Sequence, residues 1–110
     1  MEKSAAIMAF KALAQDSRLA IFRLLVMAAP AGLPARVIAS RQQILPSTLS
    51  GHLALLHRAG LVRARRDGRE IIYTAQLARI GALVDFLLLD CCNGRETECM
   101  AKIARDRLVG

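Results

Sequence analysis

Cysteine is missing from the first ninety residues of this chain, and long apolar runs are missing throughout. A transmembrane helix needs about 20 consecutive apolar residues, whereas the uncharged run at residues 24–35 is short and contains Pro30 and Pro34. The opening string M-E-K-S-A-A has no apolar core of the signal-peptide type. We therefore expect a cytoplasmic protein with no membrane segment, in which thiols stay reduced and available.

Internal repeats, low-complexity tracts and linkers are also absent, so the 110 residues are expected to form a single domain. A chain of this length buries only a small core, and such domains often depend on a metal or a partner subunit. Hydrophobic residues nevertheless make up 55% of the chain. This excess of apolar surface predicts a subunit interface.

Acidic residues are scarce: nine Asp and Glu stand against sixteen Lys and Arg, which gives a formal net charge of +7. Five arginines fall within a single short stretch, namely Arg58, Arg63, Arg65, Arg66 and Arg69. Asp67 and Glu70 alone oppose them. A basic stripe favours a polyanionic partner, with nucleic acid first among the candidates. A solubilising face is the alternative.

Apolar spacing and chain breakers predict five to six helices and two strands. The helices are expected near residues 5–13, from an Asp16 cap onward, at 35–41, from Pro46 to the Gly60 stop, at 76–92 and at 99–108. The strands are expected at residues 61–65 and 71–75, joined by a turn with Asp-Gly, a strong hairpin signal. Helix, turn, helix and hairpin in this order predict an α+β winged helix-turn-helix fold with a two-stranded wing.

The helix that begins at Pro46 has an unusual first two turns. One face is apolar at helical spacing, whereas small and hydrogen-bonding residues crowd the rest, namely Ser47, Thr48, Ser50, Gly51 and His52. Ser and Thr compete with the backbone inside a helix, so this choice makes sense where the helix end faces a polar surface. We expect these five residues to read base edges in the major groove of DNA. Ordinary solvated helix surface is the alternative.

The hairpin supplies a second expected contact with DNA. Arg65, Arg66 and Arg69 lie at or near its tip. Arginines at such a tip suit phosphates or the minor groove, which position a protein on the duplex. The DNA-binding residues predicted from the sequence are therefore these three and the five of the preceding helix.

On these residues the chain resembles the arsenic-repressor family (ArsR/SmtB) of bacterial metal-responsive transcription repressors. The matching strings are A-L-A-Q-D-S-R-L-A-I-F-R-L-L (residues 12–25), P-S-T-L-S-G-H-L-A-L-L-H-R-A-G-L-V (46–62) and R-R-D-G-R-E-I-I-Y (65–73). The resemblance implies a homodimer built on the first and last long helices. It also implies binding to an imperfect palindrome in double-stranded DNA, with release when an inducer binds. At Leu45 the family often has a serine cap, so Pro46 is expected to set the helix start instead.

The helix expected at residues 76–92 is apolar around nearly its whole circumference. A helix of this kind is buried on all sides, which in so small a domain requires a partner subunit. Leu83, Phe86 and Leu87 are expected to lie against that subunit or against the first helix. The sequence thus predicts one winged-helix domain, residues 1–110, in which residues 76–99 hold a dimerisation helix and a thiol cluster.

That thiol cluster consists of Cys91, Cys92 and Cys99. Residues 32–37 lack the C-x-C of the family's common arsenic site, and the last helix lacks the His of its common zinc site. Trivalent arsenic takes three thiolates in a pyramid, whereas structural zinc takes four ligands. The ligand count therefore predicts arsenite, or antimonite, as an inducer bound by all three cysteines, with no organic cofactor.

Adjacent residues on a helix diverge by about 100°. Cys91 and Cys92 can therefore converge only if the helix end unwinds, which the following Asn-Gly permits. Other interpretations stay open: packing cysteines, a redox or persulfide sensor, a two-thiol site selective for methylarsenite, or a site for another soft metal. An enzyme is not expected, because neither C-x-x-C nor an anion-binding Gly loop is present.

Overall fold

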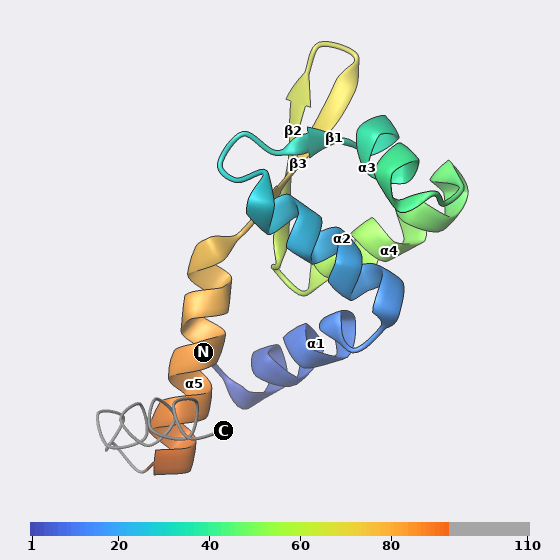
Figure 1. The fold of residues 1–110 in the computed structure, drawn as a ribbon. Helices are drawn as coiled ribbons and strands as arrows, with labels where there is room; N and C mark the ends of the chain where they lie inside the picture. Colours follow the sequence, from blue (N-terminus) through green and yellow to red (C-terminus); the bar gives the residue numbers. More distant parts are fainter. Residues whose placement is uncertain (93–110) are drawn as a thin grey trace, which may run out of the picture.

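The computed structural model describes the backbone of residues 1–92 and the side chains of residues 1–88. In order, its elements are α1 (Lys3–Leu13), α2 (Asp16–Met27), β1 (Leu33–Pro34), α3 (Ala35–Gln42), α4 (Pro46–Arg58), β2 (Val62–Asp67), β3 (Glu70–Ala75) and α5 (Leu77–Cys92). Helices α3 and α4 form the helix-turn-helix, and β2 with β3 forms the wing (Figure 1). The expected α+β winged helix-turn-helix fold is confirmed. The helix expected at residues 99–108 lies outside the described residues.

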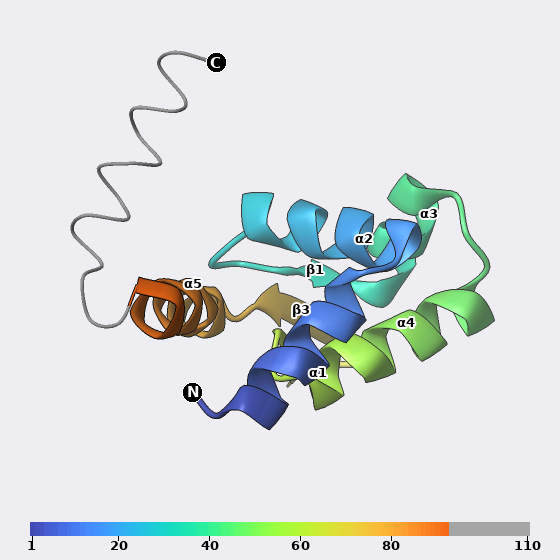
Figure 2. The same ribbon diagram turned by 90° about the horizontal axis from the view of Figure 1, so that it is seen from below.

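The elements separate a head, formed by the helix-turn-helix and the sheet, from a helical arm. Helices α2, α3 and α4 pack together beside the sheet, whereas α5 leaves the end of β3 and runs away from the wing (Figure 1). Seen from below, α5 lies beside α1, which in turn lies over α2 and α4 (Figure 2). The first and last long helices are therefore neighbours within one chain.

Apolar residues from all the helices of the described chain and from the sheet build the core. Its largest fully buried side chains are Ile21, Leu25, Ile38, Leu49, Leu56, Leu61 and Val62. The leucines that α4 presents at spacings of four and three are buried, as their spacing predicts. The buried residues of α1 are all alanines, Ala6, Ala9 and Ala12. These small residues allow a close approach to the core, and of the larger side chains of α1 Leu13 packs against it partly buried.

The sheet has three strands in the order β1-β3-β2, one more than the sequence predicts. Strand β1 is only two residues long and pairs antiparallel with β3 through Leu33 opposite Tyr73 and Pro34 opposite Ile72. It carries no periodic signal because two residues are too few to show alternation. Proline is tolerated there because β1 is an edge strand.

The wing turns one residue later than an Asp-Gly turn would. Asp67 and Glu70 are paired, so the two loop residues are Gly68 and Arg69. Gly68 has a φ of 65°. A glycine with positive φ at the first loop position is the pattern of a type II′ hairpin turn, which places Arg69 at the tip of the wing.

Two helix starts show how the local sequence sets the boundaries. The sequence predicts Asp16 as the cap of α2, but the cap is Gln15, whose side-chain oxygen accepts from the N–H of Arg18 at 2.8 Å. Gln15 is extended, and its longer side chain reaches that amide, so Asp16 becomes the first residue of the helix. Helix α4 has no side-chain cap at Leu45 and begins with Pro46, as predicted.

Helix α5 is not enclosed within one chain. Leu83 is buried in the core and Phe86 packs against it, whereas Leu77, Val84 and Leu87 are exposed by 52%, 45% and 40%. A search of the described residues for a helix long and apolar enough to cross a membrane finds no candidate. Part of the apolar surface of α5 thus stays exposed in a single chain.

Candidate nucleic-acid interface

Helix α4, named here the reader helix, presents the predicted polar residues outward. Ser47, Thr48, Ser50 and Gly51 are exposed, and His52 is half-buried. Leu49 and Leu53 anchor the same two turns in the core with 1% and 3% exposure. The structure thus brings the five candidate base-reading residues together on one helix, and the buried leucines fix the orientation of that helix.

The turn before the reader helix is fixed by backbone geometry. Gln43 ends α3 in the left-handed conformation, with a φ of 55°. The N–H of Ile44 then donates to the carbonyl of Ala39 at 3.1 Å, which closes the reversal typical of a helix C-terminus. This sharp reversal directs the chain into Pro46 and sets the angle at which the reader helix leaves α3.

The wing separates its arginines by face. Successive strand residues point to opposite faces, and in β2 Arg66 lies opposite Ile71 while Arg65 lies opposite Ile72. The guanidinium of Arg65 donates to the carbonyl of Ala31 at 3.0 Å, which ties the wing to the loop before β1. Arg66 and Arg69 are exposed toward the tip. Arg65 therefore has a visible role in positioning the wing, which the sequence did not suggest, and its DNA contact stays a prediction.

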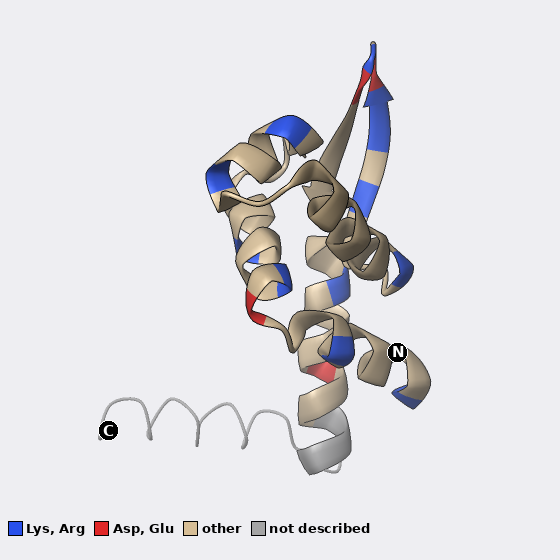
Figure 3. Cartoon of the chain, turned by 90° about the vertical axis from the view of Figure 1, so that its right-hand side faces the viewer, with Lys and Arg blue, Asp and Glu red and all other residues tan. Residues whose placement is uncertain are grey.

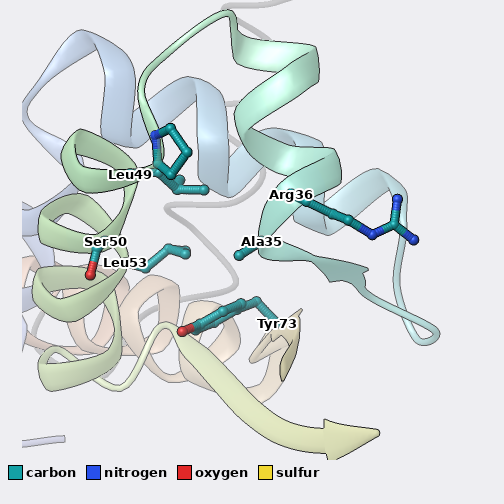
Figure 4. A pocket seen from close by; sticks show the side chains of 7 residues that line it. Ala35, Arg36, Leu49, Ser50, Leu53 and Tyr73 are labelled. Carbon is teal, nitrogen blue, oxygen red and sulfur yellow. The ribbon is translucent and has the colours of Figure 1, made fainter. Parts of the chain in front are cut away.

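A small cavity of about 220 Å³ separates the reader helix from the wing. Ser50 and Leu53 of the reader helix, Ala35 of α3 and Tyr73 of β3 all line it, and the phenol of Tyr73 extends toward the reader helix (Figure 4). Tyr73 is not among the sequence-predicted site residues, although it closes the third matching string. Its position could have been found from the alternation of β3, since Ile72 is buried and its neighbours face the other way.

Arg36 is a further missed residue on this side of the molecule. Its side chain extends out of the cavity (Figure 4) and its Nε forms an ion pair with a carboxylate oxygen of Glu70 at the wing. The pair joins the first turn of α3 to the end of the wing across 34 positions of sequence. No local pattern could have indicated it, because the wing and α3 meet only in the folded chain.

Positive charge lies along the wing and also on the helices (Figure 3). In the part of the chain with described side chains, Arg36 and Glu70 form the one ion pair. The cation of that pair belongs to α3, so the exposed Arg66 and Arg69 of the wing are available to a polyanion. The geometry as a whole offers a polar helix end flanked by a basic hairpin, an arrangement that fits a DNA major groove and its phosphates.

The predicted thiol site is placed only in part. Helix α5 extends through Cys91 and Cys92, which are its last two residues, whereas Cys99 lies outside the described residues. Within the described residues no group of three His, Cys, Asp or Glu side chains is arranged to hold a metal. Trivalent arsenic at the three cysteines stays a prediction.

Comparisons with known proteins agree with this geometry. A family described as a helix-turn-helix domain matches residues 13–65. The transcriptional activator HlyU of Vibrio cholerae is 35% identical over 98 residues, which cover 87% of this chain and 88% of HlyU. An ArsR-like transcriptional regulator from Rhodococcus sp. RHA1 has a solved structure that matches with a TM-score of 0.71 at 25% identity, over 93% of this chain and 92% of that protein.

The chain belongs to the ArsR/SmtB family. As an ArsR/SmtB protein it is a DNA-binding transcriptional regulator, and its relatives are regulators and not enzymes. Reduced HlyU from Vibrio cholerae matches with a TM-score of 0.63 at 32% identity, over 76% of this chain and 85% of that one. A homodimeric winged helix-turn-helix domain from Mycobacterium bovis, a possible ArsR-family regulator, also has a TM-score of 0.63 at 32% identity, over 76% and 78% of the two chains.

Proposed function

We propose that this ArsR/SmtB protein is a cytoplasmic homodimeric repressor that trivalent arsenic releases from an imperfect palindromic operator. The DNA-binding part of this proposal is supported by one observation, the exposed polar end of the reader helix beside the basic wing. The proposed inducer site rests on the cluster of Cys91, Cys92 and Cys99, which are the three cysteines of the chain and supply three thiolates. Three soft ligands suit arsenite or antimonite.

The homodimer would form on the outer faces of α1 and α5. Both helices leave large apolar side chains exposed: Ile7 and Phe10 on α1, and Leu77, Val84 and Leu87 on α5. Two such neighbouring faces are more apolar than a monomer normally exposes. The homodimeric relative from Mycobacterium bovis supports the same assembly. A symmetric dimer would place its two reader helices on two half-sites about one DNA turn apart.

Coupling between the thiols and the reader helix would pass along α5. The first turns of α5 contact the end of the reader helix, because a Cβ on Gly60 would lie 2.9 Å from Nε of Arg79. Gln76 also donates its N–H to the carbonyl of Leu61 at 2.8 Å, just after that end. Inducer binding at Cys91 and Cys92 would act on the opposite end of the same helix. A shift of α5 would therefore change the position of both reader helices in the dimer.

The thiol geometry requires a local change of structure. Cys91 and Cys92 are adjacent within α5, and neighbouring helix positions diverge by about 100°. Binding one arsenic atom through both would unwind the last turn and bring Cys99 to the same point. Such a rearrangement gives the inducer different affinities for the DNA-bound and free states, which release from DNA requires.

Titrating a fluorescent complex of DNA and protein with arsenite, methylarsenite, zinc and peroxide tests this function. Arsenite is expected to release DNA at one equivalent per protomer, and zinc is expected to have no effect. Release by peroxide alone would favour a thiol redox sensor. That second candidate is supported by HlyU, whose reduced form is among the similar solved structures. A preference for methylarsenite that survives Cys99→Ser would indicate a two-thiol site.

A further inference from the structure

A second group of cations lies on the flank of the reader helix away from the wing. A groove of about 230 Å³ runs between α1, α2 and the reader helix, and its lining is Met8, Lys11, Ala12, Arg18, Leu55 and Arg58. Half of these residues are cations and the others are apolar. None of the three cations forms an ion pair within the part of the chain whose side chains are described. We call this feature the basic groove.

The basic groove is held in shape by Arg18. Its Nε donates to the carbonyl of Ala12 at 2.7 Å, and its Nη2 donates to the carbonyl of Lys11 at 3.5 Å. These bonds use part of the five-donor guanidinium and fix it over the C-terminal end of α1. Lys11 and Arg58 are exposed on either side, so their charges are available to an anion.

The basic groove continues the exposed strip of the reader helix. Arg58 follows Gly51 by seven residues, which is about two helical turns, or roughly 10 Å along the same face. The opposite flank is different: Ser50, Ala54 and His57 border a cavity shared with Ala64 and Tyr73 of the wing. The reader helix therefore has the wing on one side and the basic groove on the other.

A helix inserted in the major groove lies between two phosphate backbones about 12 Å apart. The wing, with Arg66 and Arg69, suits the backbone on its own side. We propose that Lys11, Arg18 and Arg58 bind phosphates of the backbone that borders the other side of the major groove. The other lining residues, Met8, Ala12 and Leu55, are apolar and add no negative charge to the groove.

This inference rests on the entry of the reader helix into the major groove and on no property of the thiols. The proposed occupant is a DNA phosphate, because the three cations beside the reader helix complement that charge. The same chemistry could bind a small free anion such as inorganic phosphate, which becomes an outcome of the test. Arsenite is left out of every measurement, so the sensor proposal does not affect the result.

The test compares Lys11→Gln, Arg58→Gln and Arg58→Lys with Arg23→Gln, which removes an exposed cation of α2 that does not line the basic groove. Fluorescence anisotropy measures affinity for a selected operator and for an unrelated duplex at several salt concentrations. Each Gln variant in the groove is expected to lower the affinity of the protein for both duplexes by a similar factor. The slope of log K against log salt should fall by about 0.9 for each phosphate that the variant no longer neutralises. Arg58→Lys should keep most of the slope.

Thermal unfolding first establishes that every variant folds like the parent chain. Groove variants with the same salt slope as Arg23→Gln would overturn the proposal. Loss of inorganic phosphate binding with an unchanged DNA slope would assign the groove to a small anion, and would overturn it as well. Failure of the parent chain to bind any duplex would instead contradict the proposed operator binding. Ethylation interference adds a positional readout: interference at the phosphates of the outer backbone should disappear in Arg58→Gln.

Discussion

Ser50 and His52 lie in the first two turns of α4, and their side chains are predicted to read base edges and so to set specificity at the scale of residues. Replacing either by Ala is expected to weaken operator binding by about 1–3 kcal/mol for each base edge that is no longer read. Binding to unrelated DNA should change little, because the phosphate contacts remain. Competition binding assays measure the ratio of the two affinities. Ser4→Ala, an exposed change on α1, is the control; an unchanged ratio in both reader variants would contradict base reading.

Two glycines offer opposite stability effects at the same scale. Gly32 has a φ of 80°, and a Cβ there would lie 2.5 Å from the carbonyl oxygen of Tyr73 and 2.6 Å from Oγ1 of Thr74. Gly32→Ala is expected to lower the free energy of unfolding by about 1–3 kcal/mol through this overlap.

Gly51 is helical with open space around it, so Gly51→Ala should raise the free energy of unfolding by about 0.5–1 kcal/mol. Urea unfolding measures both; a stabilised Gly51→Ala that binds operator poorly would show that backbone and DNA approach closely at Gly51.

At the scale of elements, periodicity located the long helices and the wing, because each buries a regular stripe. It missed β1, whose two residues are too short for a pattern, and it placed the α2 cap at Asp16 instead of Gln15. It could not assign the faces of the wing either, since they depend on a register that pairs Arg65 with Ile72. Site residues were predicted where they cluster in the sequence, in the first turns of α4 and around the tip of the wing. The residues Arg36 and Tyr73, which join it from other elements, were not.

The element-scale expectation that the structure sharpens is the interface on α5. Leu83 and Phe86 belong to the core of their own chain or pack on it, so they report poorly on assembly. Leu87 is exposed, and Leu87→Glu should give a folded monomer because a lone buried charge at an interface is costly. Ala78→Glu is the matched control, since Ala78 lies two turns from the charged Asp85 on the same strip. Light scattering gives the mass; a dimeric Leu87→Glu protein would place the interface elsewhere.

At the scale of the whole molecule, one helix spans from the reader helix to the cysteines. Near the start of α5, the side chain of Arg79 lies beside Gly60, which follows the C-terminal end of α4. Cys91 and Cys92 lie three turns or more beyond Arg79, at the other end of α5. If α5 moves as a rigid unit, thiol chemistry at one end changes the spacing of the reader helices at the other. The small residue at position 60 allows the close packing that such transmission needs. Coupling of only about 1–3 kcal/mol would be enough for regulation.

Replacing Arg79 separates inducer binding from DNA release. Arg79→Ala removes the side chain between α5 and the end of the reader helix but leaves the cysteines in place. Both the variant and the parent chain are expected to bind one arsenite per protomer, but the variant should release DNA less completely. Cys91→Ser, Cys92→Ser and Cys99→Ser should each keep DNA binding and lose the arsenite response. Equilibrium dialysis with arsenic analysis measures stoichiometry, and anisotropy measures release.

The coupling between the two ligands is expected to be reciprocal. In the parent chain, operator DNA should weaken arsenite binding by the same factor by which arsenite weakens DNA binding. In Arg79→Ala this factor should be smaller. Full release by Arg79→Ala would mean that the signal reaches the reader helix by another route.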